Sequence, residues 1–239
     1  MIDITHGILP QHVLQGALVL ADALPYMPAG VHLAIVDPGV GGSRRPLALR
    51  GADGRLYVGP DNGLLLVAAD RLGGVVEAVE IAAPAYMLDP VSATFHGRDV
   101  FAPAAAHLAV GVPLERLGPG LDPKGLVRVD LPEARIEDGR IHATVVVVDR
   151  FGNLRLNVTA ADLREVAIEH GIAVEVEVDG RQYAAVVART FADVGLGKLI
   201  LYEDSSRSMS LAVNRGSAAR HLAVVTGQSV ALVAPAESE

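Results

Sequence analysis

The sequence predicts two domains of different class: an α/β domain with a central sheet flanked by helices, then a smaller, mostly antiparallel β barrel or sandwich. In the first half, strongly apolar segments alternate with segments of helical periodicity, which is typical of α/β proteins. In the second half, six strand-like segments follow one another at short spacing, with one helical interruption. The change occurs at "LPEARIE" (131–137), so we expect the first domain over 1–133 and the second over 137–239.

The first half contains four predicted strands and three predicted helices. The strands cover 31–37, 46–50, 56–59 and 75–82, and several of them are wholly apolar, as buried strands require. The helical patterns cover 12–27, 61–73 and 99–111. Asp61 and Asp99 stand at the starts of two of these patterns, where an acid caps or stabilises a helix N-terminus.

The second half contains strands with one predicted helix between them. The expected strands cover 140–149, 172–180, 181–189, 198–204, 208–214 and 229–235. Asp179-Gly180 stands between two of them and predicts a tight hairpin turn. Thr159 followed by Asp162 resembles a capping box and predicts a helix over 160–171.

The composition excludes several classes of protein. The chain has 239 residues, a formal net charge of −8 and no cysteine. Disulfides, thiolate metal sites and cysteine nucleophiles are therefore excluded, and neither nucleic acid nor an anionic membrane is an expected partner. No apolar run reaches membrane-spanning length, and "MIDITHGILPQHV" (1–13) lacks a signal-peptide pattern, so we expect a cytoplasmic protein.

The stretch "AIVDPGVGGSRRPLAL" (34–49) places one acid and two guanidinium groups on a glycine-rich turn. On pattern alone this is a strand-to-strand connection with its charges in solvent. The alternative is that Asp37 forms a functional pair with Arg44 or Arg45. In the same way, His96 in "SATFHGRDVFAP" (92–103) is either a core or cap histidine or an acid/base group beside a helix.

Three other site types fit poorly. The glycines of "DPGVGGSRR" lead into a strand, whereas phosphate-binding loops lead into a helix. "HGRD" is superficially similar to a kinase catalytic loop, but the other kinase motifs are missing. A two-metal site has ligand types but no tight pair spacing, so we do not expect a metal. The residues weighed for it are Asp3, His6, Asp37, Asp61, His96 and Asp99.

Two stretches of the second half are candidates for ligand binding. In "VVVVDRFGNLRLN" (145–157), Asp149, Phe151 and Asn153 occupy one short turn after an apolar strand. Taken alone, the aromatic ring indicates a residue of the hydrophobic core, but the acid, the ring and the amide together suit a ligand with an amine and a flat ring. The serines of "EDSSRSMSLAVNRGSA" (203–218) read as ordinary polar groups of a strand edge.

Taken together, these motifs resemble the S-adenosylmethionine hydroxide adenosyltransferase family, which is related to the fluorinases and chlorinases. The resemblance covers essentially the whole chain and rests on "DITHGILP", "VDPGVGGSRR", "GPDNGLL", "TFHGRDVFAPAAAHLA", "VDRFGNL" and "SSRSMSLAVN" in that order. It implies hydrolysis of S-adenosyl-L-methionine to adenosine and methionine by in-line attack of water or hydroxide on C5′, with neither metal nor cofactor. In the halide-using relatives the positions of Asp37 and His96 are tyrosines, which disfavours a halogenase here.

The resemblance also implies roles for individual residues. The water-activating trio is Asp37, Arg44 and His96, with Arg45 as an alternative to Arg44. The implied substrate-binding residues are Thr94, Phe95, Gly97, Asp149, Phe151, Asn153, Phe191, Ser205, Ser206 and Asn214. Family members are homotrimers with active sites shared between subunits, so self-association is expected here.

The sequence departs from the family pattern at its start. Family members carry a strand before "DITH" whose acid holds the ribose hydroxyls, whereas this sequence begins at Met1-Ile2-Asp3. We therefore expect weakened ribose binding. The alternative to a hydrolase is a non-catalytic relative that binds adenosine or S-adenosylmethionine.

Overall fold

A computed structural model describes residues 1–234. The chain divides into two compact units, the first covering 1–130 and the second starting at Leu131. Within residues 1–234 no helix has the length and apolar character needed to cross a bilayer.

The first unit is built on a five-stranded sheet with the strand order β1-β3-β2-β4-β5. The strands are β1 (Val31–Leu33), β2 (Pro46–Gly51), β3 (Leu56–Pro60), β4 (Val75–Glu80) and β5 (Gly120–Leu121). The pairing of β1 with β3 is parallel, and the other pairings are antiparallel. Of the strands expected from the sequence, three match closely, and β5 is too short to show a period.

The predicted strand 31–37 is wrong at its C-terminal end, because β1 stops at Leu33. The amide of Ala34 still donates to the carbonyl of Val58 in β3. Further along the segment, a side chain takes the place of the strand partner. Asn62 Nδ2 donates to the carbonyl of Val36 at 2.8 Å. The segment from Ile35 therefore leaves the sheet in an extended form and leads into the glycine turn.

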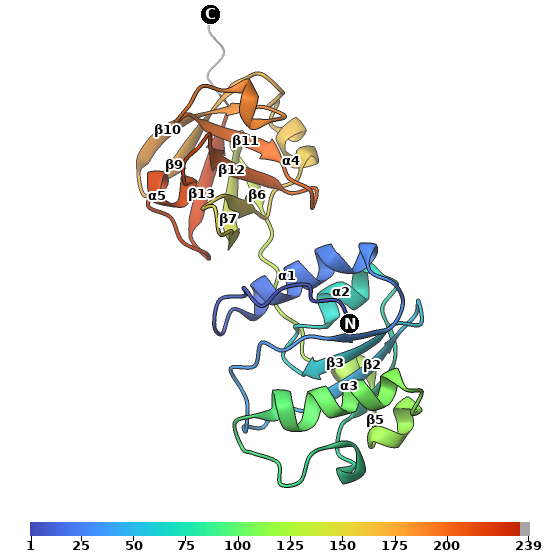
Figure 1. The fold of residues 1–239 in the computed structure, drawn as a ribbon. Helices are drawn as coiled ribbons and strands as arrows, with labels where there is room; N and C mark the ends of the chain where they lie inside the picture. The colour runs from blue at the N-terminus through green and yellow to red at the C-terminus, as the bar shows by residue number, and fades with distance from the viewer. Residues whose placement is uncertain (235–239) are drawn as a thin grey trace, which may run out of the picture. The chain divides into compact units, whose positions relative to one another are not determined.

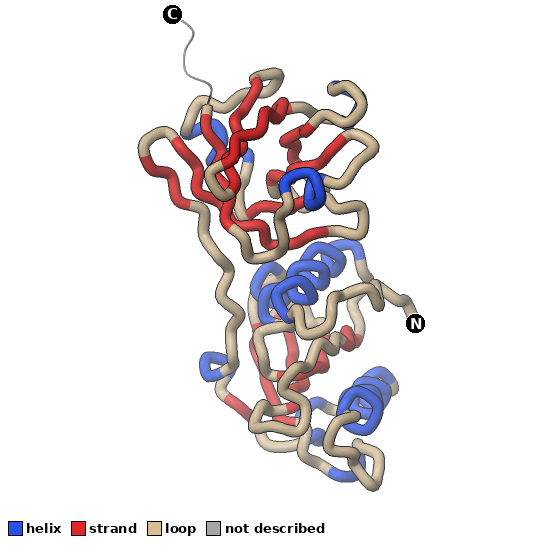
Figure 2. Tube along the Cα trace, turned by 90° about the vertical axis from the view of Figure 1, so that its left-hand side faces the viewer, coloured by secondary structure: helices blue, strands red, loops and turns tan. Residues whose placement is uncertain are grey.

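Helices cover both faces of this sheet (Figures 1 and 2). Helices α1 (Val13–Ala23) and α2 (Leu66–Arg71) lie on one face, and α3 (Ala102–Ala109) lies on the other (Figure 1). A π-helix (Gly97–Phe101) leads directly into α3. Short 3₁₀ turns cover Leu24–Tyr26, Pro84–Tyr86, Leu114–Leu117 and Pro123–Gly125.

The helix predicted over 61–73 is shorter than expected, and Asp61 does not cap it. Helix α2 begins only at Leu66, because Gly63 has a φ of +88° and Asn62 Oδ1 accepts from Leu64 N. Asp99, by contrast, is an acid in the first turn of the π-helix, as its position in the sequence indicates.

In the second unit, seven strands close into a barrel, because β13 pairs with both β9 and β7. The order around the barrel is β13 (Ser229–Val233), β9 (Ala173–Val178), β10 (Arg181–Val187), β11 (Leu199–Glu203), β12 (Met209–Val213), β8 (Leu154–Leu156) and β7 (Arg140–Val148). An eighth strand, β6 (Arg135–Glu137), pairs with β7. Helices α4 (Ala160–Glu165) and α5 (Ala218–Leu222) and a 3₁₀ turn (Phe191–Asp193) complete the unit. The barrel interior is a single apolar cluster rich in valine and leucine.

Two local predictions are confirmed in this unit. Asp179 and Gly180 both have positive φ, 48° and 74°, between the paired residues Val178 and Arg181, which is the geometry of a type I′ hairpin. Thr159 and Asp162 form a reciprocal capping box at the start of α4.

One prediction for this unit is wrong, and two strands were not predicted. The pairing of β10 with β11 is parallel, and the other pairings around the barrel are antiparallel, which agrees with the expected mostly antiparallel barrel. The helix expected over 160–171 ends at Glu165. Strands β6 and β8 escaped the sequence pattern because three residues are too few to show a period. The last residue of the predicted strand 229–235, Pro235, lies outside the described residues.

Candidate active site

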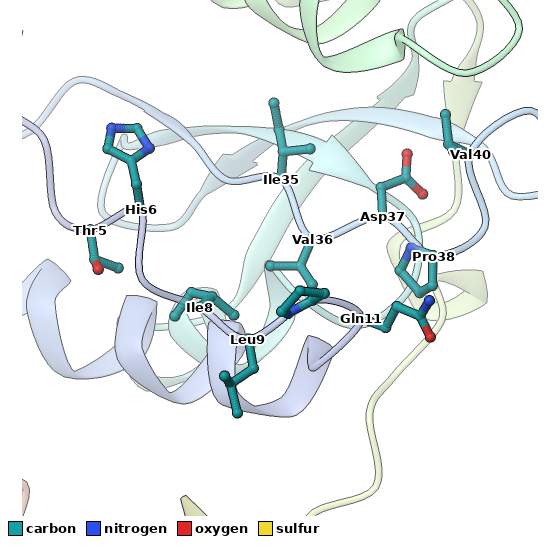
Figure 3. Close-up of a pocket in the computed structure, with 11 residues that line it drawn as sticks. Thr5, His6, Ile8, Leu9, Gln11, Ile35, Val36, Asp37, Pro38 and Val40 are labelled. Atoms are coloured by element: carbon teal, nitrogen blue, oxygen red, sulfur yellow. The ribbon is translucent and has the colours of Figure 1, made fainter. Parts of the chain in front are cut away.

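The glycine turn of the first unit presents Asp37 on one side of the extended segment that leaves β1. In Figure 3 the side chains of Ile35 and Asp37 point to one side and that of Val36 to the other, as alternation along an extended chain requires. Val40 N donates to the carbonyl of Asp37, and Gly42 N donates to that of Gly39, at 3.3 and 3.0 Å. These bonds fold the turn back on itself.

Arg44 returns across the turn and binds Asp37 through two nitrogens. Its Nε lies 3.0 and 3.1 Å from the two carboxylate oxygens, and Nη2 lies 2.5 Å from Oδ2. The side chains are only 9% and 7% exposed. A bidentate pair of this kind holds both groups in one orientation.

His96 joins this pair from a distant part of the sequence. Its Nδ1 lies 2.8 Å from Arg44 Nη2. The structure therefore brings together three of the residues singled out in the sequence, Asp37, Arg44 and His96.

A buried carboxylate holds the loop that carries His96. Asp99 is 1% exposed and accepts from Ser92 N at 2.8 Å and from Arg98 Nε at 2.5 Å. The side-chain hydrogen bond from Arg98, followed by the backbone bond from Ser92, lowers the pKa of Asp99 below its ordinary value. This carboxylate closes the 92–99 loop and was not assigned that role from the sequence.

The loop also carries Thr94, Phe95 and Gly97. Phe95 is 59% exposed, and the Arg98 guanidinium lies 5.0 Å from its ring centroid. Thr94 N donates to Ser92 Oγ at 3.5 Å. Gly97 opens the π-helix next to Ile35.

The structure separates the two adjacent arginines. Arg45 binds Asp61, through Nε at 2.8 Å and Nη2 at 2.5 Å, and donates to the carbonyl of Gly125. Asp61 also accepts from Val127 N and has a side chain only 3% exposed. Arg45 therefore ties the turn to the segment around 125–127, and Arg44 alone faces Asp37.

Asp37 lines a pocket of about 520 Å³ beside the N-terminal segment (Figure 3). Polar side chains from that segment share this lining: Thr5, His6 and Gln11. Of these, only His6 was weighed together with Asp37 from the sequence, as a metal ligand, and the proximity of Thr5 and Gln11 to Asp37 depends on the fold.

The second unit has a pocket of about 650 Å³ lined by four of the expected ligand-binding residues, Asp149, Phe151, Asn153 and Phe191. Phe151 and Phe191 are 63% and 40% exposed. Asp149 Oδ1 accepts from Phe151 N and Asn153 N, and Asp149 Oδ2 accepts from Asn153 Nδ2. The carboxylate thus shapes the turn that carries the aromatic ring.

Further residues of this pocket were missed in the sequence. Its lining also includes Tyr202, Val213, Arg215, Gly216 and Arg220. Tyr202 lies beside Phe191, with ring centroids 5.4 Å apart. Burial, together with the charges of Asp204 and Asp149, raises the pKa of the Tyr202 hydroxyl, so this ring is a neutral wall at physiological pH.

The remaining expected residues, Ser205, Ser206 and Asn214, do not line this pocket but are close in sequence to residues that do. Ser206 N donates to Asp204 Oδ1 at 2.8 Å in the turn that begins after β11, and Ser205 belongs to the same turn. Asn214 follows β12, and its Nδ2 donates to the carbonyl of Val194 at 2.8 Å. Across residues 1–234, no cluster of three or more His, Cys, Asp or Glu is arranged to hold a metal ion.

Comparison with family models decides the relationship. The SAM hydroxide adenosyltransferase N-terminal domain matches residues 1–118, and the C-terminal domain of the same name matches residues 143–231. The chain belongs to this family. Both the trio and the aromatic pocket lie within the matched residues.

Individual relatives agree with the family models. An "(R)-S-adenosyl-L-methionine hydrolase" of Salinispora tropica is 47% identical, and the match covers 98% of this chain and 86% of the relative. A "Fluorinase" of Nocardia brasiliensis is 29% identical over 96% of this chain and 85% of the relative. A solved structure of an uncharacterized conserved protein from Thermotoga maritima superposes with a TM-score of 0.88 at 35% identity, covering 97% of this chain and 88% of that one.

Proposed function

We propose that the chain hydrolyses S-adenosyl-L-methionine to adenosine and L-methionine, without metal or cofactor. The observation that carries the proposal is the Asp37–Arg44–His96 constellation within a chain that is 47% identical to a named S-adenosyl-L-methionine hydrolase. The relatives' name specifies the R epimer at sulfur, and we propose the same substrate for this chain.

The chemistry needs little assistance at the leaving group. The sulfonium leaves C5′ as a neutral thioether, so the reaction requires neither a general acid nor a Lewis acid. The site must instead place one water in line with the C5′–S bond, since holding reactants in an attack geometry removes much of the entropic barrier. Polar groups fixed by their mutual hydrogen bonds, as in the trio, suit this task.

The pocket of the second unit supplies the chemistry for the nucleoside and the amino acid. The exposed faces of Phe151 and Phe191 suit stacking on adenine, Asn153 suits its polar edge, and Asp149 suits the methionine ammonium. Thr94 and Phe95 are proposed for the ribose end, and Ser205 and Ser206 for the methionine carboxylate. The backbone around Asn214 is proposed to complete the adenine slot, and Gly97 is a further proposed substrate-binding residue. We also propose the homotrimer that the family resemblance implies.

The test is product analysis with purified protein. The R and S epimers of S-adenosylmethionine are incubated separately, and adenosine is quantified by chromatography, with and without a chelator. We expect adenosine from the R epimer, equal rates with chelator, and no 5′-halogenated product when fluoride or chloride is added. Absence of adenosine from both epimers would overturn the proposal, and loss of activity with chelator would overturn its metal-free part.

Variants connect the activity to the site. His96→Ala and Asp37→Ala should lower turnover by about 100-fold or more while changing adenosine affinity little, because they act on water. Arg50→Ala is the matched control, since it removes an ion pair to Glu77 of the same unit, both side chains being 38% exposed. Sedimentation velocity tests the trimer, and a stable, fully active monomer would contradict it.

A further inference from the structure

The contact between His96 and Arg44 constrains where the proton of His96 lies. A guanidinium nitrogen only donates, and Arg44 Nη2 lies 2.8 Å from Nδ1 of His96. The Nδ1 atom must therefore accept, which assigns the lone pair to Nδ1 and the proton to Nε2 of a neutral ring. A protonated ring, or a neutral ring with its proton on Nδ1, would point a hydrogen at the guanidinium.

Arg44 is itself held so that it cannot turn away from His96. Nη2 donates to Asp37 Oδ2 at 2.5 Å in addition to its contact with Nδ1, which uses both of its hydrogens. Behind the guanidinium lies the ring of Phe101, with 5.2 Å between Arg44 Cζ and the ring centroid. Phe101 is fully buried in an apolar cluster with Val58 and Ala104, so this ring is a fixed surface.

The π-helix explains why Phe101 and His96 meet the same guanidinium. His96 is the N-cap of the π-helix, and the amide of Ala102 donates to the carbonyl of Gly97, a bond across five residues. Such bonds stack residue i+5 over residue i, whereas an α-helix stacks i+4. Residues 96 and 101 are also five apart, so the π-turn brings both side chains to the side on which Arg44 lies. An α-helix over the same residues would turn one of them away.

We propose that His96 acts in the hydrolysis as a hydrogen-bond donor through Nε2–H, and that Phe101 is the positioning residue that holds it in this form. The inference rests on the proposed function for its chemistry. It adds two assignments: His96 donates a hydrogen bond and does not act as a general base, and the buried Phe101 ring positions the groups of the site.

The assignment leaves one proton acceptor in the trio. Arg44 has no lone pair to offer, and the lone pair of His96 at Nδ1 is occupied. The Asp37 carboxylate lines the pocket beside the N-terminal segment and retains acceptor capacity. As the water oxygen bonds to C5′, the C5′–S bond breaks with its electron pair on sulfur, and one water proton passes to Asp37. A weak base suffices, because the oxonium formed by the attack is strongly acidic.

An amide substitution separates a donor from a base. In His96→Gln, the amide oxygen can accept from Arg44 while the NH₂ group donates in place of Nε2–H, but the amide cannot take a proton at neutral pH. We expect His96→Gln to keep turnover within about tenfold of wild type, and His96→Ala to lose about 100-fold or more. If the wild-type protein releases adenosine and both variants lose turnover equally, the donor role is wrong.

Nitrogen-15 NMR of the histidine rings tests the same assignment without any activity. The wild-type spectrum, compared with that of His96→Gln to identify the His96 ring, should show Nε2 carrying the proton and Nδ1 bare at neutral pH. A proton on Nδ1 would overturn the proposal. If the protein makes no adenosine but Nδ1 is bare, the proposed function fails while the tautomer assignment stands.

Phe101→Leu tests the positioning role, with Leu108→Ala as control. Both residues are buried in the same apolar cluster, and Leu108 lies in α3. Loss of the ring face should lower kcat by about 3- to 30-fold with KM little changed, and the NMR signals of the His96 ring should become those of a mixture of tautomers. The control should lose stability but keep kcat and the His96 signals. Unchanged kcat and an unchanged His96 spectrum in Phe101→Leu would refute the positioning role.

Discussion

Gly41 offers a sharp test of the contact between the glycine turn and the loop that carries His96. Gly41 has a φ of +74°, and a Cβ added there would lie 2.4 Å from the carbonyl oxygen of Ala93. Ordinary contacts of Cβ atoms begin near 3.4 Å, so Gly41→Ala must push the two segments apart by about 1 Å. Gly54 is a matched control, because its φ is +83° and no atom lies within 4 Å of an added Cβ.

The two alanine variants should differ by the clash alone. Each has the cost of a left-handed residue, about 1–2 kcal/mol. Gly41→Ala adds the cost of overpacking, about 1–3 kcal/mol. The activity should separate them further, because a displacement of about 1 Å at reacting groups lowers rates by about 100-fold. We therefore expect Gly54→Ala to keep near wild-type turnover and Gly41→Ala to lose most of it.

The assays are urea unfolding at equilibrium and release of adenosine from S-adenosylmethionine under conditions in which both variants are folded. The decisive quantity is the difference between the variants in unfolding free energy and in kcat. If Gly41→Ala and Gly54→Ala match in both, the turn does not press on Ala93, and our reasoning about how the trio is assembled is wrong.

Three further predictions concern other parts of the chain. Burial, followed by the charge of Arg55, lowers the pKa of His32. Below about pH 6.5 the unfolded chain therefore binds more protons than the folded one, and the unfolding free energy should fall as the pH is lowered. Urea unfolding should show a less steep fall in His32→Phe than in wild type. Equal dependence of the unfolding free energy on pH in the two proteins would exclude His32 as the cause. Asp61→Ala removes the carboxylate that accepts from Arg45 and from Val127 N and should lower the unfolding free energy by about 1.5–3 kcal/mol, and a loss under about 0.5 kcal/mol would contradict a stabilising role of this contact. Phe191→Leu should weaken adenosine binding by about 1–3 kcal/mol in calorimetric titration, and unchanged affinity would argue against stacking there.

Turns and helix caps could be predicted from the sequence wherever interactions between residues close in the chain decide the conformation. The hairpin turn at Asp179-Gly180 requires two positive φ values, and the capping box at Thr159 and Asp162 satisfies backbone groups within four residues. Apolar strands of five or more residues were recognisable for the same reason. The family motifs, read as a resemblance, also singled out Asp37 and His96 before any geometry was known.

Long-range contacts decided the remainder, and a linear sequence does not display them. Which of the two arginines faces Asp37 depends on Asp61, because Asp61 binds Arg45 and leaves Arg44 beside Asp37. The end of β1 at Leu33 depends on the side chain of Asn62, and the parallel pairing of β10 with β11 depends on the path of the chain between them. Propensity favours neither outcome, because each is stabilised only when distant segments are already in place.

The sequence by itself determined the two classes of fold, the local turns and caps, and the residue types of the candidate site. Only the tertiary structure decided how the trio is held. In the sequence, Phe101 is an apolar residue of a predicted helix, and its contact with the Arg44 guanidinium appears only in the structure, where a π-helix carries it. An i+5 stacking has no hydrophobic period of its own, so the protonation state that we assign to His96 follows from packing rather than from any motif.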